Sequence, residues 1–144
     1  MSRPNGFTLV EVLVVVFIVG IITATFPGAI ASYQGRTSLN TAFHTTMQSL
    51  RRAQVLSQAV DGDETWGVYL QNGSVTIFRG ASFGSRDTNE DETFDISTNV
   101  TLGGLSEIVF DRLTGEPQPT GSITFDTNHD SRALIINEKG ALEL

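Results

Sequence analysis

One carboxylate lies inside an apolar run near the N-terminus, and its type and position call for a chemical partner. Residues 7–26 are twenty consecutive positions with a single charge, at Glu11. An ionised carboxylate in an apolar helix costs about 2.5–3.5 kcal/mol at the middle of a bilayer, and less near its surface. We therefore expect Glu11 to pair with a cationic group, because such a pair cancels most of the cost of burying either charge alone. The alternative is a charge that is tolerated at a helix end.

A second pattern has the form of the turn that carries the nucleophile in many serine hydrolases. Residues 80–84 read Gly-Ala-Ser-Phe-Gly and would place Ser82 as the nucleophile. That motif requires a helix directly after it and a large α/β sheet beneath it, but residues 85–89 are typical of a loop. The candidate bases, His44 and His129, are single and are better interpreted as surface or interface residues. We expect no catalytic activity.

A third pattern resembles the opening of a calcium-binding loop. The oxygen-bearing residues at alternate positions are Asp126, Asn128 and Asp130. The sixth position of such a loop should be Gly and the twelfth Glu, but here they are Ser131 and Asn137. A polar turn between two strands explains these residues better than a metal site.

The overall composition excludes most other chemistry. The chain has 144 residues, a formal net charge of -7 and no cysteine, which excludes disulfides, thiol catalysis and Cys-ligated metals. The acidic residues at 87–92 lie in the longest predicted loop, 80–92, where a solvated, mobile segment fits better than a calcium site. We expect no metal and no cofactor. Nucleic acid is not an expected partner either, because the adjacent Arg51 and Arg52 are typical of a solvated helix face.

The apolar run has the length of a membrane span. Twenty helical residues extend about 30 Å, the thickness of the hydrocarbon core of a bilayer. Arg3 precedes the run and the next basic residue is Arg36, which predicts a cytoplasmic N-terminus and a C-terminal region on the outer side. An ordinary signal peptide is the alternative, because Ala29-Ile30-Ala31 has the form of a cleavage site. Against it, the run exceeds the usual 7–15 apolar residues and contains a carboxylate.

The residues around Glu11 resemble the signal of type IV prepilins and type II secretion pseudopilins. The resemblance rests on a short basic leader that ends in Gly6, followed by Phe7, by Glu11 and by the apolar run. It implies cleavage between Gly6 and Phe7 by a prepilin peptidase, which also methylates the new Phe7 amine. It further implies that Glu11 faces the terminal amine of a neighbouring subunit. Pro27 and Gly28 match the place where this family's helix kinks, and Pro and Gly weaken a helix locally.

The rest of the chain predicts one amphipathic helix followed by strands. Apolar residues recur every three or four positions at Leu39, Phe43, Met47, Leu50, Ala53, Leu56 and Val60, which predicts a stripe that docks on a globular domain, or less plausibly a groove for a partner. Asp61, Gly62 and Asp63 should end the helix. Later residues alternate with a period of two. The predicted strands are 65–70, 74–79, 93–96, 100–102, 106–110, 122–125, 132–137 and 141–144, with a hairpin at Asn72-Gly73.

These elements give an α+β fold class, with a long N-terminal helix packed on an antiparallel sheet or small sandwich. The predicted parts are a leader at 1–6, a transmembrane or filament-core helix at 7–28, an amphipathic helix at 29–62 and a globular β-domain at 63–144. Looser motifs resemble the GspH/FimT-like minor pseudopilins and minor pilins: residues 50–54, 66–68, 108–111, 121–125 and 135–140. DNA-binding members of that branch use basic residues near the C-terminus. Here residues 137–144 hold two acids and one Lys, so DNA binding is not carried over.

The resulting hypothesis is a non-enzymatic minor pilin or pseudopilin that helps to initiate a filament or forms its tip. The resemblance implies these partners: other pilin subunits through the N-terminal helix, a prepilin peptidase, an inner-membrane assembly platform, and membrane lipid before assembly. The expected location is the inner membrane, with the C-terminal domain periplasmic or extracellular, and then the pilus. Two alternatives remain. One is the major pilin of a simple pilus; the other is a secreted β-domain that begins near Ser32.

Overall fold

The computed structural model describes residues 6–128 and 130–143, except for the side chains of residues 25–32. The chain divides into two compact units, Met1–Gln34 and Gly35–Leu144. We call them the N-terminal unit and the C-terminal unit, and each is considered by itself. A single α-helix, α1 (Leu9–Gln58), contributes to both.

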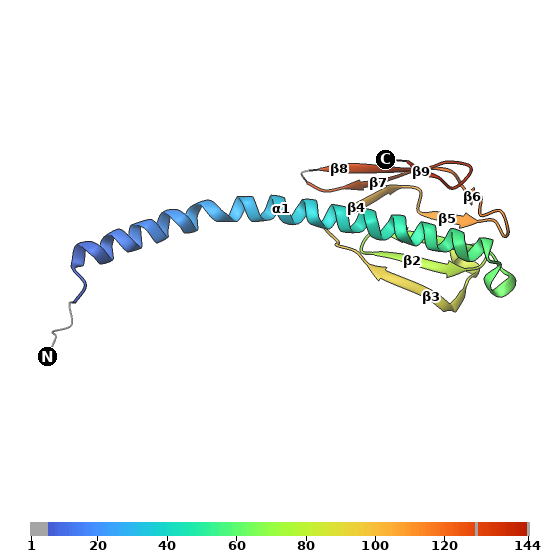
Figure 1. Cartoon of the computed structure of the whole chain (residues 1–144), viewed down its shortest axis with the longest axis horizontal. Coiled ribbons are helices and arrows are strands. Elements are labelled where there is room, and N and C mark those ends of the chain that lie inside the picture. The colour runs from blue at the N-terminus through green and yellow to red at the C-terminus, as the bar shows by residue number, and fades with distance from the viewer. Residues whose placement is uncertain (1–5, 129, 144) are drawn as a thin grey trace. The chain divides into compact units, whose positions relative to one another are not determined.

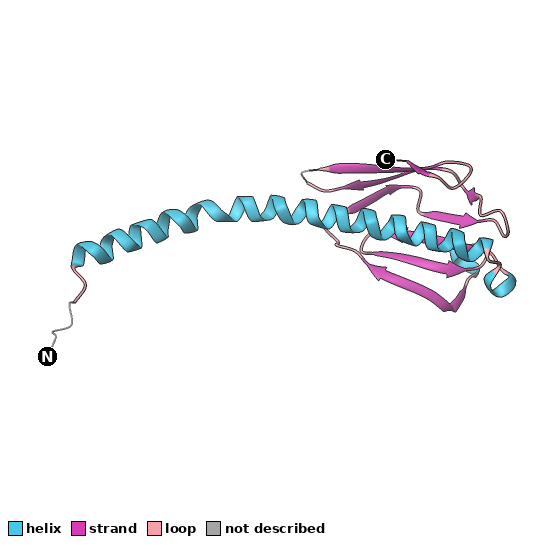
Figure 2. Cartoon of the chain, in the orientation of Figure 1, coloured by secondary structure: helices cyan, strands magenta, loops and turns pink. Residues whose placement is uncertain are grey.

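In the N-terminal unit the chain becomes helical at Leu9, within the long apolar run (Figure 2). The helical assignment continues through positions 27 and 28. Because the structure describes no side chains at residues 25–32, the kink predicted at Pro27 and Gly28 stays a prediction, as does the division of the helix at residue 28. Among the residues that the structure describes, no helical stretch meets the length and apolarity required of a membrane span.

In the C-terminal unit, α1 lies against the strands (Figure 1). The predicted apolar stripe packs in the core except for Val60, which lies beyond the end of the helix with a left-handed backbone. Leu39, Phe43 and Leu50 are almost completely buried. The helix ends at Gln58, slightly before the predicted stop, and a 3-10 turn at Asp61–Asp63 follows. Gly62 has a φ of 69° in this turn, the left-handed conformation that glycine adopts without steric cost.

Within the described residues, nine strands form two antiparallel sheets. One sheet has the order β3-β2-β1-β5-β6 and the other β4-β7-β8-β9. The strands are β1 (Trp66–Gln71), β2 (Ser74–Arg79), β3 (Asp87–Asp95), β4 (Thr101–Gly104), β5 (Glu107–Phe110), β6 (Pro117–Gln118), β7 (Gly121–Asp126), β8 (Ser131–Ile136) and β9 (Leu142–Glu143). Gln71 pairs with Ser74 across the predicted two-residue hairpin turn, where Gly73 has a φ of 95°. The predicted α+β class, with a helix packed on antiparallel strands, is confirmed.

One hydrophobic core joins α1 to both sheets. Phe43 of α1 meets Phe125 of β7 edge to face, with ring centroids 5.5 Å apart. From the other sheet, β1, β2 and β5 contribute Val68, Ile77 and Ile108, all fully buried. Burial of side chains of this size contributes about 1.5–3 kcal/mol each relative to leaving them exposed. The C-terminal unit therefore has its own core, built without the apolar run of the N-terminal unit.

The prediction of a mobile loop at residues 80–92 was wrong. A 3-10 turn, η2 (Phe83–Ser85), and most of strand β3 occupy that region. The sequence concealed the strand because β3 lies at the edge of its sheet and carries mostly polar side chains. It also carries few of the apolar residues whose alternation predicts a strand. The short strand β6 was missed as well, because it is only two residues long and begins with a proline that is typical of turns.

Side-chain hydrogen bonds hold the helix and the two sheets together at their edges. The Ser57 hydroxyl, in the last turn of α1, donates to the Phe110 carbonyl oxygen of β5 and accepts from the Trp66 N–H of β1, both at 2.9 Å. The Asn72 side-chain oxygen accepts the Leu102 N–H of β4 at 2.8 Å. The hairpin tip of one sheet therefore satisfies a donor on a strand at the edge of the other sheet, which protects that edge from pairing with another chain.

Two buried hydroxyl groups, those of Thr46 and Thr65, have no hydrogen-bond partner among the described residues. Thr46 of α1 is fully buried, and its hydroxyl meets neither a donor nor an acceptor among the described residues. An unsatisfied buried hydroxyl costs roughly 1–3 kcal/mol.

Thr46→Val replaces this hydroxyl with a methyl group of similar size, so we expect the free energy of unfolding to rise by about 1–2 kcal/mol. The measurement is urea unfolding of the full chain in detergent, followed by the fluorescence of Trp66, the sole tryptophan. Thr41→Val is the matched control, because Thr41 is exposed on the same helix, and it should change stability by less than about 0.5 kcal/mol. A loss of stability in Thr46→Val would show that the hydroxyl has a partner.

Candidate assembly and processing site

The predicted cleavage point lies just outside α1. Gly6, Phe7 and Thr8 are non-helical and exposed, and the Phe7 side chain is 82% exposed. A Cβ atom at Gly6 would meet nothing within 4 Å. The chain's own described packing therefore does not require glycine at position 6, and any such requirement must come from a molecule that binds this segment.

Thr8 and Glu11 define the first turn of α1. The Thr8 hydroxyl accepts the Glu11 N–H at 3.3 Å, and the Thr8 carbonyl oxygen accepts the Val12 N–H at 3.2 Å. This is N-cap geometry, in which a side-chain oxygen satisfies a donor that the helix leaves unpaired. The spacing Thr-x-x-Glu is also that of a capping box. Glu11 thus lies in the helix's first turn, where the helix dipole favours a negative charge.

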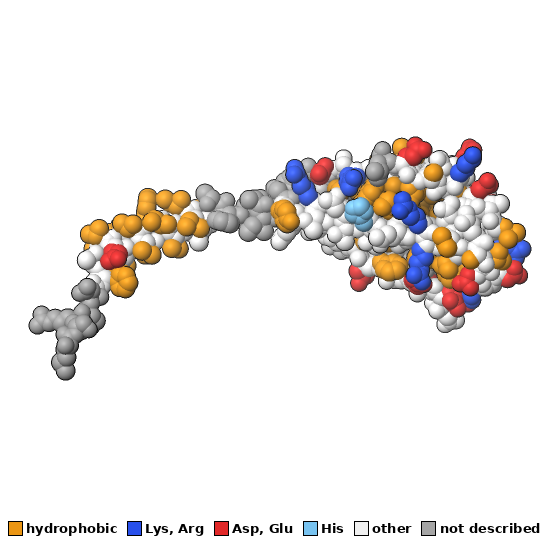
Figure 3. Space-filling view, viewed as in Figure 1, with side chains coloured by type: hydrophobic (Ala, Val, Ile, Leu, Met, Phe, Trp, Pro, Cys, Tyr) orange, Lys and Arg blue, Asp and Glu red, His pale blue; other side chains and the backbone are white. Residues whose placement is uncertain are grey.

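The helix that follows is apolar on every face. Exposed apolar side chains surround it from Leu9 to Val19, and Phe17 is 66% exposed. Figure 3 shows hydrophobic side chains over the described surface of this unit. The Thr23 hydroxyl donates to the Val19 carbonyl oxygen at 2.8 Å, so this polar group is satisfied within its own helix. Such a surface requires lipid or other protein around it.

Residues 1–26 match the family model for the prokaryotic N-terminal methylation motif. The chain carries a type IV pilin-like prepilin signal. This motif includes Gly6, Phe7 and Glu11, and it implies processing by a prepilin peptidase and assembly with other pilin subunits. No curated protein matches the chain. No solved structure matches it either.

The structure places the other candidate residues in ordinary structural contacts. Ser82 has an extended backbone, and its hydroxyl forms a hydrogen bond with that of Ser85 at 2.8 Å. A 3-10 turn follows Ser82, where a nucleophile turn would require a helix. His44 is exposed and packs its ring edge-on against Phe43. His129 lies outside the described residues.

The residues that resemble the opening of a calcium loop lie where β7 ends and β8 begins. Asp126, at the end of β7, pairs with Ser131 at the start of β8. Between them, the Thr127 hydroxyl donates to the Asp130 carbonyl oxygen at 2.8 Å and accepts the Asp130 N–H at 3.1 Å. Asn128 is exposed in the same turn. Among the described residues, no three acidic or histidine side chains are grouped closely enough to hold a metal ion.

Arginines of the same chain pair with the acidic residues of β3. Arg79 of β2 contacts Asp87 at 2.6 Å and Glu90 at 3.6 Å. Arg52 of α1 contacts Glu92 at 2.6 Å. Because these carboxylates already have cationic partners, β3 is bound to the rest of the C-terminal unit instead of forming the loose acidic loop that we predicted. Arg52 also has a specific partner that sequence periodicity could not identify.

The segment before β3 is held by an aromatic cluster that the sequence analysis missed. The Phe83 ring stacks on Tyr69 of β1 with centroids 3.9 Å apart, and the Arg86 guanidinium lies 3.6 Å from the Phe83 centroid on that ring. The Phe83 N–H donates to the Glu107 carboxylate of β5 at 2.9 Å. The one feature of the sequence that could have indicated this cluster is a lone aromatic residue in a polar stretch. In the fold, Phe83 covers part of the sheet at Tyr69.

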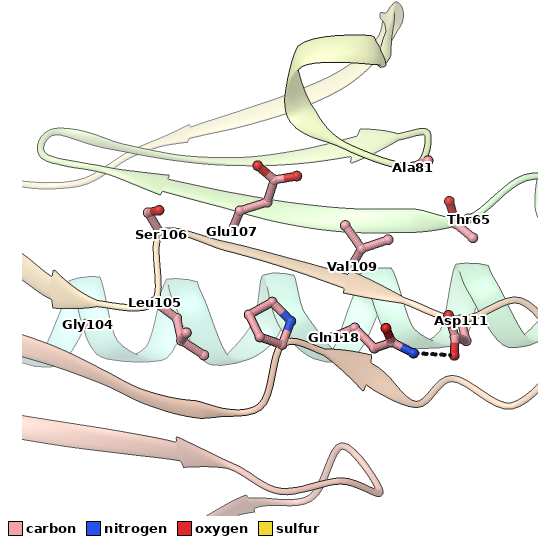
Figure 4. A pocket seen from close by; sticks show the side chains of 10 residues that line it. Thr65, Ala81, Gly104, Leu105, Ser106, Glu107, Val109, Asp111 and Gln118 are labelled. Atoms are coloured by element: carbon pink, nitrogen blue, oxygen red, sulfur yellow. Dashed lines mark hydrogen bonds between the residues drawn. The ribbon is translucent and has the colours of Figure 1, made fainter.

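A groove of about 720 Å³ opens where the chain crosses between the two sheets. Figure 4 shows it beside β5, with Leu105 on the segment between β4 and β5 and Gln118 at the end of β6. Both of its carboxylates have partners within the chain. Glu107 accepts the Phe83 N–H, and Asp111 accepts from the Gln118 side chain at 3.0 Å. The groove was not predicted, because its residues come from separate strands.

The hydrogen bonds and ion pair of Asp87 make the stability of the fold depend on pH. The Asn89 N–H and then the Arg79 guanidinium hold the pKa of Asp87 below its ordinary value of 3.8. A carboxyl with a lowered pKa stabilises the fold above the unfolded-state pKa, and this contribution is lost as the pH falls through the folded-state value.

Asp87→Asn should therefore lower the free energy of unfolding at pH 7, and its difference from wild type should narrow as the pH falls below 3.8. Urea unfolding at pH 7 and at about pH 3 measures this difference. Asp95→Asn is the control on the same strand, since among the described residues no salt bridge includes Asp95. An Asp87→Asn difference that is the same at both pH values would contradict the argument.

Proposed function

We propose that this protein is a structural subunit of a type IV pilus or type II secretion pseudopilus. The observation that carries the proposal is an exposed, non-helical Gly6–Phe7 bond directly before a helical stretch that is apolar except for Glu11 in its first turn. A peptidase reaches such a bond without unfolding the domain. After cleavage the chain would begin at Phe7, which places a new cationic amine near the start of the apolar helix.

In this proposal the pairing of Glu11 with an amine sets the axial register of the filament. When the helices of many subunits replace lipid around one another, an unpaired Glu11 carboxylate or Phe7 amine would carry a large desolvation cost. When two subunits are placed so that the Glu11 carboxylate of one meets the Phe7 amine of the next, both desolvation costs are removed. A buried ionic pair that fixes register is the best-attested use of such groups.

We further propose the GspH/FimT-like branch and a minor role at the filament tip or in its initiation. The support is the order of the fold, with one helix followed by an all-antiparallel β-domain, together with the looser motifs of that branch in the sequence. The absence of a cysteine pair weighs slightly against the major pilin, because many major pilins close a C-terminal loop with one. The abundance of the chain in purified filaments distinguishes the two roles.

The same proposal includes the location of the protein and the activities that we do not expect of it. The apolar helix would be held in the inner membrane with its N-terminus cytoplasmic and its C-terminal unit outside, until an assembly platform moves it into the filament. We propose no enzymatic role, since the Ser82 hydroxyl is paired with Ser85. We also propose no nucleic-acid partner, because the formal net charge is -7 and binding to phosphates depends on basic residues.

Co-expression with a prepilin peptidase tests the assignment directly. The expected product begins at Phe7 and carries one added methyl group on its terminal amine. Intact mass and N-terminal sequencing measure both. A product that begins near Ser32, or an uncleaved chain, would contradict the proposal and favour a secreted or membrane-held β-domain.

Glu11→Gln should leave cleavage at Gly6–Phe7 unchanged and reduce incorporation into filaments more than tenfold. The variant keeps the shape of the side chain but leaves the Phe7 amine unpaired, and breaking a buried pair costs about 3–5 kcal/mol. The readout is the ratio of filament-bound to membrane-bound protein. Glu64→Gln, at an exposed position of the C-terminal unit, is the control and should match wild type. Normal incorporation of Glu11→Gln would overturn the register mechanism.

A further inference from the structure

We infer that Thr8 is a positioning residue for processing. As the N-cap of α1 it starts the helix at Leu9 and thereby keeps the Gly6–Phe7 peptide bond outside the helix. The inference rests on the proposed function, because it concerns how this chain is presented to its peptidase.

The hydrogen bonds at the helix start support this role. The Thr8 hydroxyl accepts the Glu11 N–H, and the Thr8 carbonyl oxygen is already the acceptor of an i to i−4 helical bond from Val12. A residue that accepts with its carbonyl while its side chain caps the next turn is the last non-helical residue of the chain. Gly6 and Phe7 therefore lie before the helical ladder.

The residue at which the helix starts determines whether the Gly6 carbonyl group, which belongs to the bond to be cleaved, is free or bound within the helix. If α1 began two or three residues earlier, the Gly6 carbonyl oxygen would accept the Val10 N–H in the helical ladder. That bond would fix the peptide in helical geometry and turn its carbonyl along the helix axis, away from an attacking nucleophile. Cleavage would then require the first turn to open before each reaction. A cap at Thr8 avoids this step.

Nothing else described in the chain holds the cleavage point in place. Phe7 is 82% exposed, and a Cβ atom at Gly6 would meet no neighbour. Whether Gly6 and Phe7 are helical or extended therefore depends on which nearby residue can cap the helix. The next residue upstream whose side chain can accept a capping hydrogen bond is Asn5. Without the Thr8 hydroxyl, a helix that starts at Asn5 would include both residues of the scissile bond.

Three variants of the full chain separate the cap from other roles of Thr8. Thr8→Val keeps the branched shape and removes the hydroxyl, Thr8→Ser keeps the hydroxyl and removes the methyl group, and Thr8→Asn changes the shape but can still cap. We expect kcat/KM for cleavage at Gly6–Phe7 to fall about fivefold in Thr8→Val, the size of effect that a typical N-cap controls. Thr8→Ser and Thr8→Asn should stay within about twofold of wild type, because both restore the cap.

A second measurement does not depend on the peptidase. Carbon-13 chemical shifts of Gly6 and Phe7, recorded for the uncleaved full chain in detergent micelles, should move toward helical values in Thr8→Val and stay extended in the other two variants. This reports the position of the helix start directly, so it distinguishes a cap from a side chain that the peptidase reads by contact.

The outcomes are distinct. Cleavage of Thr8→Val at the wild-type rate would overturn the inference and leave the proposed function intact. Slow cleavage of Thr8→Ser and Thr8→Asn with unchanged carbon shifts would also overturn it, because the peptidase would then recognise threonine itself. If the wild-type chain is not cleaved at Gly6–Phe7, the proposed function fails, and this inference fails with it.

Discussion

The uncovered apolar surface of α1 ahead of residue 25 is the constraint on which the rest of the molecule depends. Side chains such as Leu13, Val16 and Phe17 are more than half exposed, whereas the C-terminal unit has a closed core of its own. One half of the helix is therefore a structural part of a folded domain, and the other half is stable only among lipids or other helices. Gly6, Phe7, Thr8 and Glu11 all lie at the start of this exposed half of the helix. In the proposed function they determine how that surface is released from the leader and covered by other subunits.

Where the helix and most strands lie could be predicted from periodicity alone. The apolar stripe from Leu39 to Ala53 has one spacing, the strands after Trp66 have another, and burial of an apolar face is what produces each pattern. Strand β3 could not be predicted in this way. Its stability comes from backbone pairing with β2 and from charges such as Asp87 and Glu92, whose arginine partners are distant in sequence or on another element. A polar edge strand therefore has the composition of a loop.

The residues of the candidate site could also be predicted only in part from the sequence. The chemical identities of Gly6, Phe7 and Glu11 were sufficient to predict processing and assembly, because a carboxylate in an apolar run is rare and costly. The role of Thr8 required the helix start to be located, since a threonine caps a helix only at its boundary. The stacking of Phe83 on Tyr69 was equally hidden, because the turn that holds Phe83 and Arg86 meets β1 only after the sheet has formed.

The hydrogen bonds at the end of α1 also have a mechanical consequence. Ser57 connects the last turn to both β1 and β5, and the Gln54 side chain reaches the Gly115 and Lys139 carbonyl oxygens. A pull along the helix axis would be opposed by these hydrogen bonds together with the packing of Leu39, Phe43 and Leu50. Contacts that bear a force at the same time divide it among them, whereas contacts that break one after another must each bear the whole force. We therefore expect the C-terminal unit to resist a force applied through α1 better than a domain that a few contacts in series hold to its helix.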